Sequence, residues 1–145
     1  MRQMAWLADI NFLLASCYDA HLHHARAVRW LNEECGAGQV GICRISQLGF
    51  LRLLNNPAIM DINAQSCAQC WAVYDALMAD ARFVYLEEPE GLERELRALT
   101  IKEAFTPKLW QDAYLLAFAK MRGLRLVTFD AALSRQHKPL VVVPK

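Results

Sequence analysis

The chain is predicted to fold as an α/β protein, with a central, mostly parallel sheet covered by helices on both faces. Three observations predict this class. Short apolar runs alternate with stretches of helical periodicity, the composition is 55% hydrophobic and 21% charged, and no linker or internal repeat interrupts the pattern. The length of 145 residues suits one domain, which we expect to span residues 1–145.

The expected strands are short apolar runs that end at a polar residue or a turn. The first ends at Asp9, and the most β-rich one, Leu126-Val127-Thr128-Phe129, ends at Asp130. The expected strands cover residues 4–8, 39–43, 82–86, 125–129 and 140–143.

The expected helices show apolar residues at helical spacing and carry residues that favour helix ends. Ser46 can cap one helix, which Asn55-Asn56-Pro57 would end, and Pro107 suits the first turn of another. The expected helices cover residues 11–17, 21–35, 46–54, 63–79, part of 87–100, 107–122 and 131–135.

Charge and cysteine content narrow the possible functions. The net charge of +1 excludes a protein that binds nucleic acid by bulk charge, so any such contact needs a local patch or a metal. No run is long enough for a membrane span, and Asp9 and Asn11 interrupt the apolar N-terminal run, against a signal peptide. Five cysteines without framework spacing favour free thiols and a cytoplasmic protein.

Three aspartates are candidates for one site. Asp9 and Asp130 follow expected strands, and ligands of open parallel sheets bind beyond the carboxyl ends of strands. Either residue alone is also explained as a helix N-cap. Asp112 shares a helical face with Leu109 and Leu116, where a carboxylate needs a partner, although a first-turn Asp can also interact with the helix dipole.

Carboxylates brought together repel one another, and a divalent cation removes that conflict. Mg²⁺ prefers hard oxygen ligands and is held by one or two carboxylates together with substrate phosphate. Such ions can activate water and stabilise the leaving oxygen of a phosphodiester. The three aspartates therefore predict metal-assisted phosphodiester hydrolysis.

At these residues the chain resembles PIN-domain proteins, specifically VapC-type toxin ribonucleases of type II toxin–antitoxin systems. The resemblance implies a three-layer α/β/α sandwich, dependence on Mg²⁺ or Mn²⁺, and cleavage of single-stranded or looped RNA. It also implies a cognate antitoxin protein and a homodimer. The matching stretches are residues 7–11, 44–57, 110–115 and 126–130, in the order of the family.

The resemblance also implies roles for single residues. Asp9, Asp112 and Asp130 would be metal ligands, with Asn11 adjusting the first and Thr128 holding a metal-bound water. Ser46 is a supporting residue. Arg44 and Lys108 each lie just before a site-bearing helix and are candidates for binding RNA phosphates, although either can also be ordinary surface charge.

One position departs from the family pattern. Gln47 stands where the family usually has a catalytic Glu, and a neutral amide can orient a water or bind a metal weakly but cannot serve as a base. Two hypotheses follow. In the first, the site binds one metal ion firmly and a second ion binds only together with RNA phosphate. In the second, Gln47 forms hydrogen bonds to the metal ligands and does not bind a metal itself. The same departure leaves open a weakened PIN-like protein that only binds RNA or an antitoxin.

Two other classes with aspartates at strand ends fit less well. A receiver domain needs an acidic pair at the first strand, and Asp9 has no adjacent acid. A dehalogenase-type phosphatase needs a second Asp where this chain has Asn11.

Overall fold

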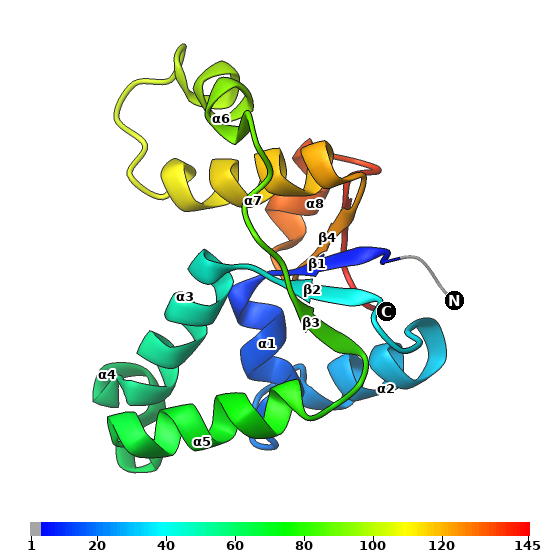
Figure 1. Ribbon diagram of the computed structural model, residues 1–145. Helices are drawn as coiled ribbons and strands as arrows, with labels where there is room; N and C mark the ends of the chain where they lie inside the picture. The colour runs from blue at the N-terminus through cyan, green and yellow to red at the C-terminus, as the bar shows by residue number, and fades with distance from the viewer. Residues whose placement is uncertain (1–3) are drawn as a thin grey trace.

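The computed structural model describes residues 4–145, and in them one five-stranded parallel sheet forms the centre of the molecule (Figure 1). The strand order is β3-β2-β1-β4-β5, so the chain builds outward from β1 on one side and then returns to add β4 and β5 on the other. The direction in which strands are added changes between β1 and β4, and ligands of open α/β sheets bind beyond the carboxyl ends of the strands at such a point. The strands are β1 (Trp6–Ala8), β2 (Val40–Ile42), β3 (Phe83–Tyr85), β4 (Arg125–Val127) and β5 (Val141–Val142).

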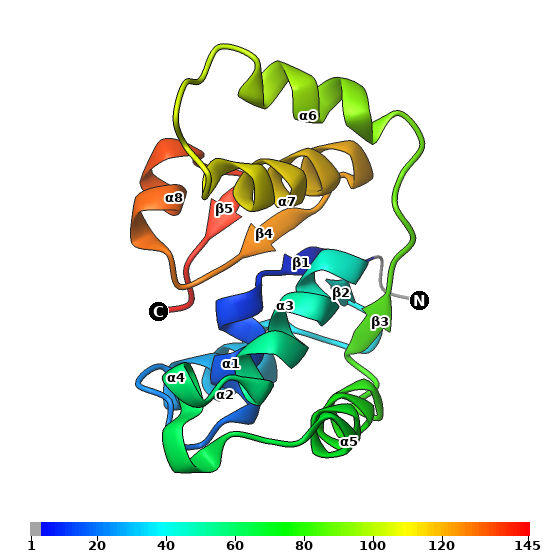
Figure 2. The same ribbon diagram turned by 90° about the vertical axis from the view of Figure 1, so that its left-hand side faces the viewer.

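Helices cover both faces of the sheet, which confirms the expected three-layer α/β/α fold. Figures 1 and 2 show α1 to α5 on one face and α6 to α8 on the other. The first layer holds α1 (Ile10–Cys17), α2 (His24–Glu34), α3 (Arg44–Asn55), α4 (Pro57–Met60), the 3₁₀ helix η1 (Asp61–Asn63) and α5 (Cys67–Met78). The second holds α6 (Leu92–Thr100), α7 (Leu109–Arg122) and α8 (Ala131–Gln136).

Each face of the sheet has its own hydrophobic core. Successive residues of a strand point to opposite faces. Accordingly Leu7 and Leu126 pack with α7, whereas Ala8 and Val127 pack with α1 and α3 on the other side. The central strands are therefore buried on both faces, as is usual for parallel sheets.

The pairing of β1 with β4 sets the position of the first aspartate. Leu7 pairs with Leu126 and Ala8 pairs with Val127. The Asp9 backbone N–H continues this ladder by donating to the Val127 carbonyl at 3.0 Å. Asp9 therefore lies beside Thr128 where both strands end.

Two helix starts differ from the sequence prediction. The expected cap at Ser46 is wrong: α3 begins at Arg44 with Cys43 as N-cap, and the Ser46 hydroxyl donates to the Ala8 carbonyl at 2.8 Å instead. Helix α5 begins at Cys67 rather than residue 63, because Ser66 and Gln69 form a capping box that fixes its first turn.

Two further starts are shifted toward the C-terminus. Residues 21–23 precede α2, since the His23 N–H donates to the His21 ring nitrogen and holds a turn there. Pro107 also lies outside its expected helix, because Lys108 is the N-cap of α7.

The remaining expectations concern the whole chain. The single domain over residues 1–145 stays a prediction, and its first three residues lie outside the described range. Among residues 4–145, no helix combines the length and the apolar character needed to cross a membrane. Cys17, Cys35, Cys43, Cys67 and Cys70 are all free thiols, as expected.

Gly49 brings α3 against the start of α1, and this contact gives a stability prediction. A Cβ built on Gly49 would lie 2.1 Å from Ile10 Cδ1 and 2.7 Å from Cγ1, so Ile10 would have to leave its rotamer. We expect Gly49→Ala to lower the free energy of unfolding by about 1–3 kcal/mol, although Ala favours a helix by about 1 kcal/mol. Urea denaturation measures this difference.

The matched control repeats the substitution in an Ile10→Ala background, where the clash is absent. There Gly49→Ala should be neutral or stabilising by up to about 1 kcal/mol. An equal loss in both backgrounds would show that Ile10 does not limit position 49.

Candidate active site

Asp9, Asp112 and Asp130 line one cavity of about 320 Å³ at the carboxyl ends of β1 and β4. Asp9 directly follows β1, Asp130 follows the end of β4, and Asp112 extends from the first turn of α7. The structure thus brings together the three acids selected from the sequence. They come from three separate segments of the chain, and the cavity lies at the reversal point of the strand order.

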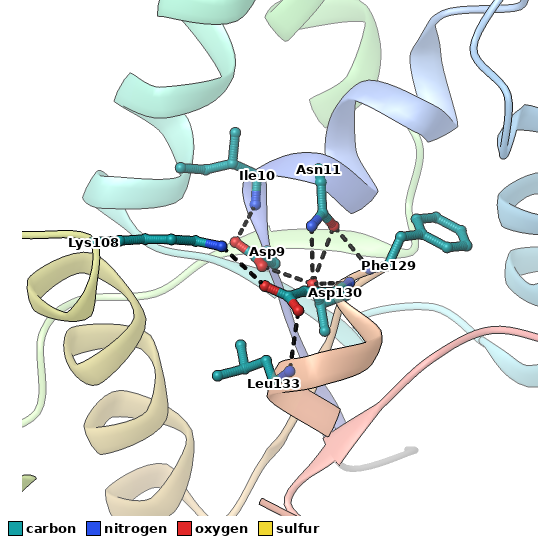
Figure 3. A network of polar contacts seen from close by, with 8 residues as sticks. Asp9, Ile10, Asn11, Lys108, Phe129, Asp130 and Leu133 are labelled. Carbon is teal, nitrogen blue, oxygen red and sulfur yellow. Dashed lines mark hydrogen bonds and ion pairs between the residues drawn. The ribbon is translucent and has the colours of Figure 1, made fainter. Parts of the chain in front are cut away.

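Both strand-end acids are also helix N-caps. Asp9 Oδ1 accepts the Ile10 N–H at 2.7 Å, and Asp130 Oδ1 accepts the Leu133 N–H at 3.0 Å. The capping explanation is therefore confirmed for both residues, and it does not exclude a role in a site. In each residue, capping fixes one carboxylate oxygen, while the second takes part in the network drawn in Figure 3.

The Thr128 hydroxyl is the centre of that network. It is fully buried, donates to Asp9 Oδ2 at 2.8 Å, and accepts the Asn11 amide at 3.0 Å and the Asp130 N–H at 3.1 Å. A hydroxyl has one proton and two lone pairs, so these three bonds use its full capacity. Thr128 therefore orients the Asp9 carboxylate. The role that the resemblance implied for Thr128, holding a metal-bound water, stays a prediction.

Asn11 ties the start of α1 to the segment that carries Asp130. Its Oδ1 accepts the Phe129 N–H at 2.9 Å while its amide donates to Thr128. Figure 3 shows the Phe129 ring pointing away from the acids. Asn11 and Asp9 thus share Thr128 as a hydrogen-bond partner, and the role of Asn11 in adjusting Asp9 stays a prediction.

The three carboxyl groups differ in their electrostatic surroundings. Asp9 is only 6% exposed, and burial raises its pKa, with further increases from the charges of Asp112 and Asp130. Burial also raises the pKa of Asp112, and the Asp130 charge adds to this. The pKa of Asp130 is lowered by the Leu133 N–H and by Lys108. Burial and mutual repulsion thus raise the pKa of two of the three acids, whereas hydrogen bonding and an ion pair lower that of the third.

Lys108 is the cation that the structure places against this cluster. Its Nζ lies 3.3 Å from Asp130 Oδ2, and this contact raises the pKa of the ammonium. The rest of the side chain is largely exposed, so the ion pair is weak and readily exchanged. Of the two predicted phosphate-binding residues, Lys108 lines the cavity.

Gln47 and Arg44 are not brought to the acids. Arg44 Nη1 donates to Gln47 Oε1 at 2.5 Å, and the guanidinium lies 4.9 Å from the centre of the Tyr85 ring. Gln47 also lowers the pKa of the Tyr74 hydroxyl by hydrogen bonding, against the raising effect of burial. Neither residue is among those that line the cavity. Gln47 instead accepts from Arg44, which lies three residues before it on α3 and over a ring of β3.

The sequence prediction missed three polar residues of the cavity: Arg52, Asn56 and Gln111. Arg52 lies three residues after Gly49 on α3, and Asn56, the C-cap of that helix, lies four residues after Arg52, so the three follow one side of α3. That spacing could have identified these residues only if α3 had already been known to face the three aspartates.

The donor set suits a hard divalent cation. It consists of carboxylate oxygens, which Mg²⁺ and Mn²⁺ prefer as ligands. Within residues 4–145, no three acidic, histidine or cysteine side chains are already close enough to share one ion. The three carboxylates would therefore have to move closer together to share one ion.

Comparison with known proteins agrees with this geometry. The PIN domain family model matches residues 7–138. Ribonuclease VapC41 of Mycobacterium tuberculosis is 37% identical over 133 residues, which cover 89% of this chain and 91% of that protein. The chain therefore belongs to the PIN-domain family and, within it, to the VapC group.

Solved structures share the fold. M. tuberculosis VapC20, described as a Sarcin-Ricin loop cleaving toxin, superposes with a TM-score of 0.70 at 15% identity, covering 97% of this chain and 100% of that one. A toxin–antitoxin complex from Klebsiella pneumoniae gives a TM-score of 0.64 at 19% identity, covering 97% and 98%.

Thr128 provides a test of the network. Thr128→Val keeps the shape of the side chain but leaves the Asn11 amide, the Asp130 N–H and one Asp9 oxygen without their buried partner. We expect a loss of about 1–3 kcal/mol in the free energy of unfolding, measured by denaturant titration. Thr128→Ser retains the hydroxyl and loses only the methyl group, so it should lose much less. A loss in Thr128→Val no larger than that in Thr128→Ser would show that the hydroxyl network contributes little.

Proposed function

We propose that the protein is a metal-dependent endoribonuclease, the toxin of a toxin–antitoxin pair, which hydrolyses phosphodiester bonds of RNA. The observation that carries this proposal is the convergence of Asp9, Asp112 and Asp130 on one cavity beside the cationic Lys108. Membership of the VapC group, whose members here are named ribonucleases, supports RNA as the substrate.

In the proposed site the three aspartates hold Mg²⁺, with Mn²⁺ as an alternative. The bound ion would supply activated water and neutralise charge on the phosphodiester. Thr128 and Asn11 keep the Asp9 carboxylate in one orientation, which lowers the cost of assembling the site. Lys108 would leave Asp130 and bind an RNA phosphate. Gln47 acts behind the site as the acceptor for Arg44.

We further propose an antitoxin protein as partner, a homodimer as the assembled form, and the cytoplasm as the compartment. The likeness to a toxin–antitoxin complex supports the first of these. The five free cysteines fit a reducing compartment.

Metal binding can be tested without any substrate. Mg²⁺ or Mn²⁺ should raise the melting temperature of the protein, since a ligand at a hundred times its Kd adds about 2.7 kcal/mol of stability. Asp9→Asn and Asp130→Asn should abolish this rise in a calorimetric scan. Asp75→Asn, which alters an exposed acid on α5, is the matched control and should keep it. A rise that survives both site substitutions would place the ion elsewhere.

RNA cleavage tests the activity itself. With Mg²⁺ and single-stranded RNA, Asp112→Asn should lower the cleavage rate by roughly 100-fold or more, because one ligand charge is lost. Asp75→Asn should cleave like the wild type, and the products should carry 5′-phosphate and 3′-hydroxyl ends. Products with 2′,3′-cyclic phosphates, or a wild-type protein without metal-dependent activity, would overturn the proposal and favour a protein that only binds RNA or an antitoxin.

A further inference from the structure

A second hollow continues from the acidic cavity along the surface between α3 and α7. It has a volume of about 420 Å³ and apolar walls, with Ile45 and Leu48 on α3 facing Trp110 and Tyr114 on α7. The cavity and this groove share Gly49, Arg52 and Gln111. The two hollows are therefore one continuous depression with an acidic end and an apolar end.

Trp110 is the exposed aromatic residue of the groove. It lies in the first turn of α7 with 62% of its surface exposed, although an indole gains from being covered. Successive helix residues turn by about 100°. Accordingly Trp110 lines the groove, Gln111 lines both hollows and Asp112 lines the cavity. A molecule held at Asp112 would thus have to extend past Gln111 to reach the Trp110 ring.

Arg52 stands where the two hollows meet. It is exposed, and its guanidinium makes no hydrogen bond or ion pair with any residue of the described range 4–145. An available guanidinium beside a carboxylate cavity suits a phosphate, which it can bind through two parallel hydrogen bonds.

We infer that the groove is a nucleotide subsite, in which the base of an unpaired RNA nucleotide stacks on Trp110 while Arg52 binds the adjoining phosphate. The inference rests on the proposed function, because it takes the acidic cavity as the place of RNA cleavage. Carboxylates for a metal, a cation for a phosphate and an aromatic face for a base follow one another along the depression. Unpaired RNA presents phosphates and exposed bases one after another along the strand, and its bases stack on aromatic side chains.

Tryptophan fluorescence tests the stacking contact. The protein in EDTA is titrated with a short single-stranded oligoribonucleotide, so that cleavage does not contribute. We expect the RNA to quench the emission, and Trp110→Phe to remove most of that quenching. Trp71→Phe changes another exposed indole, 48% exposed on α5, and should leave the quenching intact. Quenching that persists in Trp110→Phe would overturn the inference.

The affinity for RNA, measured at several salt concentrations, distinguishes the stacking contact of Trp110 from the phosphate contact of Arg52. Trp110→Ala should weaken binding by about 5- to 150-fold without changing its salt dependence, since base stacking involves no released counterion. Arg52→Ala should lower the slope of log K against log salt by about 0.7, the value for one phosphate contact to a single strand. Unchanged affinity in Trp110→Ala would overturn the subsite.

Cleavage kinetics and sedimentation distinguish this inference from the proposed function. If the wild type cleaves RNA with Mg²⁺ and Trp110→Ala keeps the same KM, the subsite fails and the ribonuclease stands. If RNA quenches Trp110 but is never cleaved, the subsite stands and the ribonuclease fails. If Trp110→Ala binds RNA normally but changes from dimer to monomer, the groove is a contact between protein chains and the inference is overturned.

Discussion

The hydrogen bond from the Thr128 hydroxyl to the Asp9 carboxylate is the interaction on which the site depends. It joins the ends of β1 and β4, the two strands between which the order of the sheet reverses. Asp9 could not remain there as an unsatisfied buried carboxylate, because an unpaired polar group in the interior is costly. The hydroxyl satisfies one oxygen and the first N–H of α1 satisfies the other, so Asp9 is held by the fold before any ligand arrives.

The sequence predicted the layers and the three acids because both depend on local patterns. Short apolar runs ending in an aspartate place that aspartate at the carboxyl edge of a parallel sheet, wherever the strands pair. The first residues of the helices were less predictable, since more than one nearby residue can serve as the N-cap of a helix. Ser46 could have capped α3, but the carbonyl of Ala8, which is distant in the sequence, takes its hydroxyl instead.

The placement of Gln47 and Arg44 could not be predicted for a related reason. Arg44 lies over Tyr85, a residue of β3, and this contact exists only after β3 has paired with β2. Gln47 then accepts from Arg44 and remains outside the cavity. The groove beside Trp110 is likewise formed by residues of α3, α6 and α7, which no spacing in the sequence connects.

The two hydrophobic cores have a consequence for the shape of this depression. The acids that follow β1 and β4 are spaced by the hydrogen-bond ladder of the sheet, which is a fixed scaffold. The walls are different, since α3 belongs to the layer on one face and α7 to the layer on the other. The mouth of the depression therefore lies between helices of two different layers, whereas its floor is set by the paired strands of a single sheet.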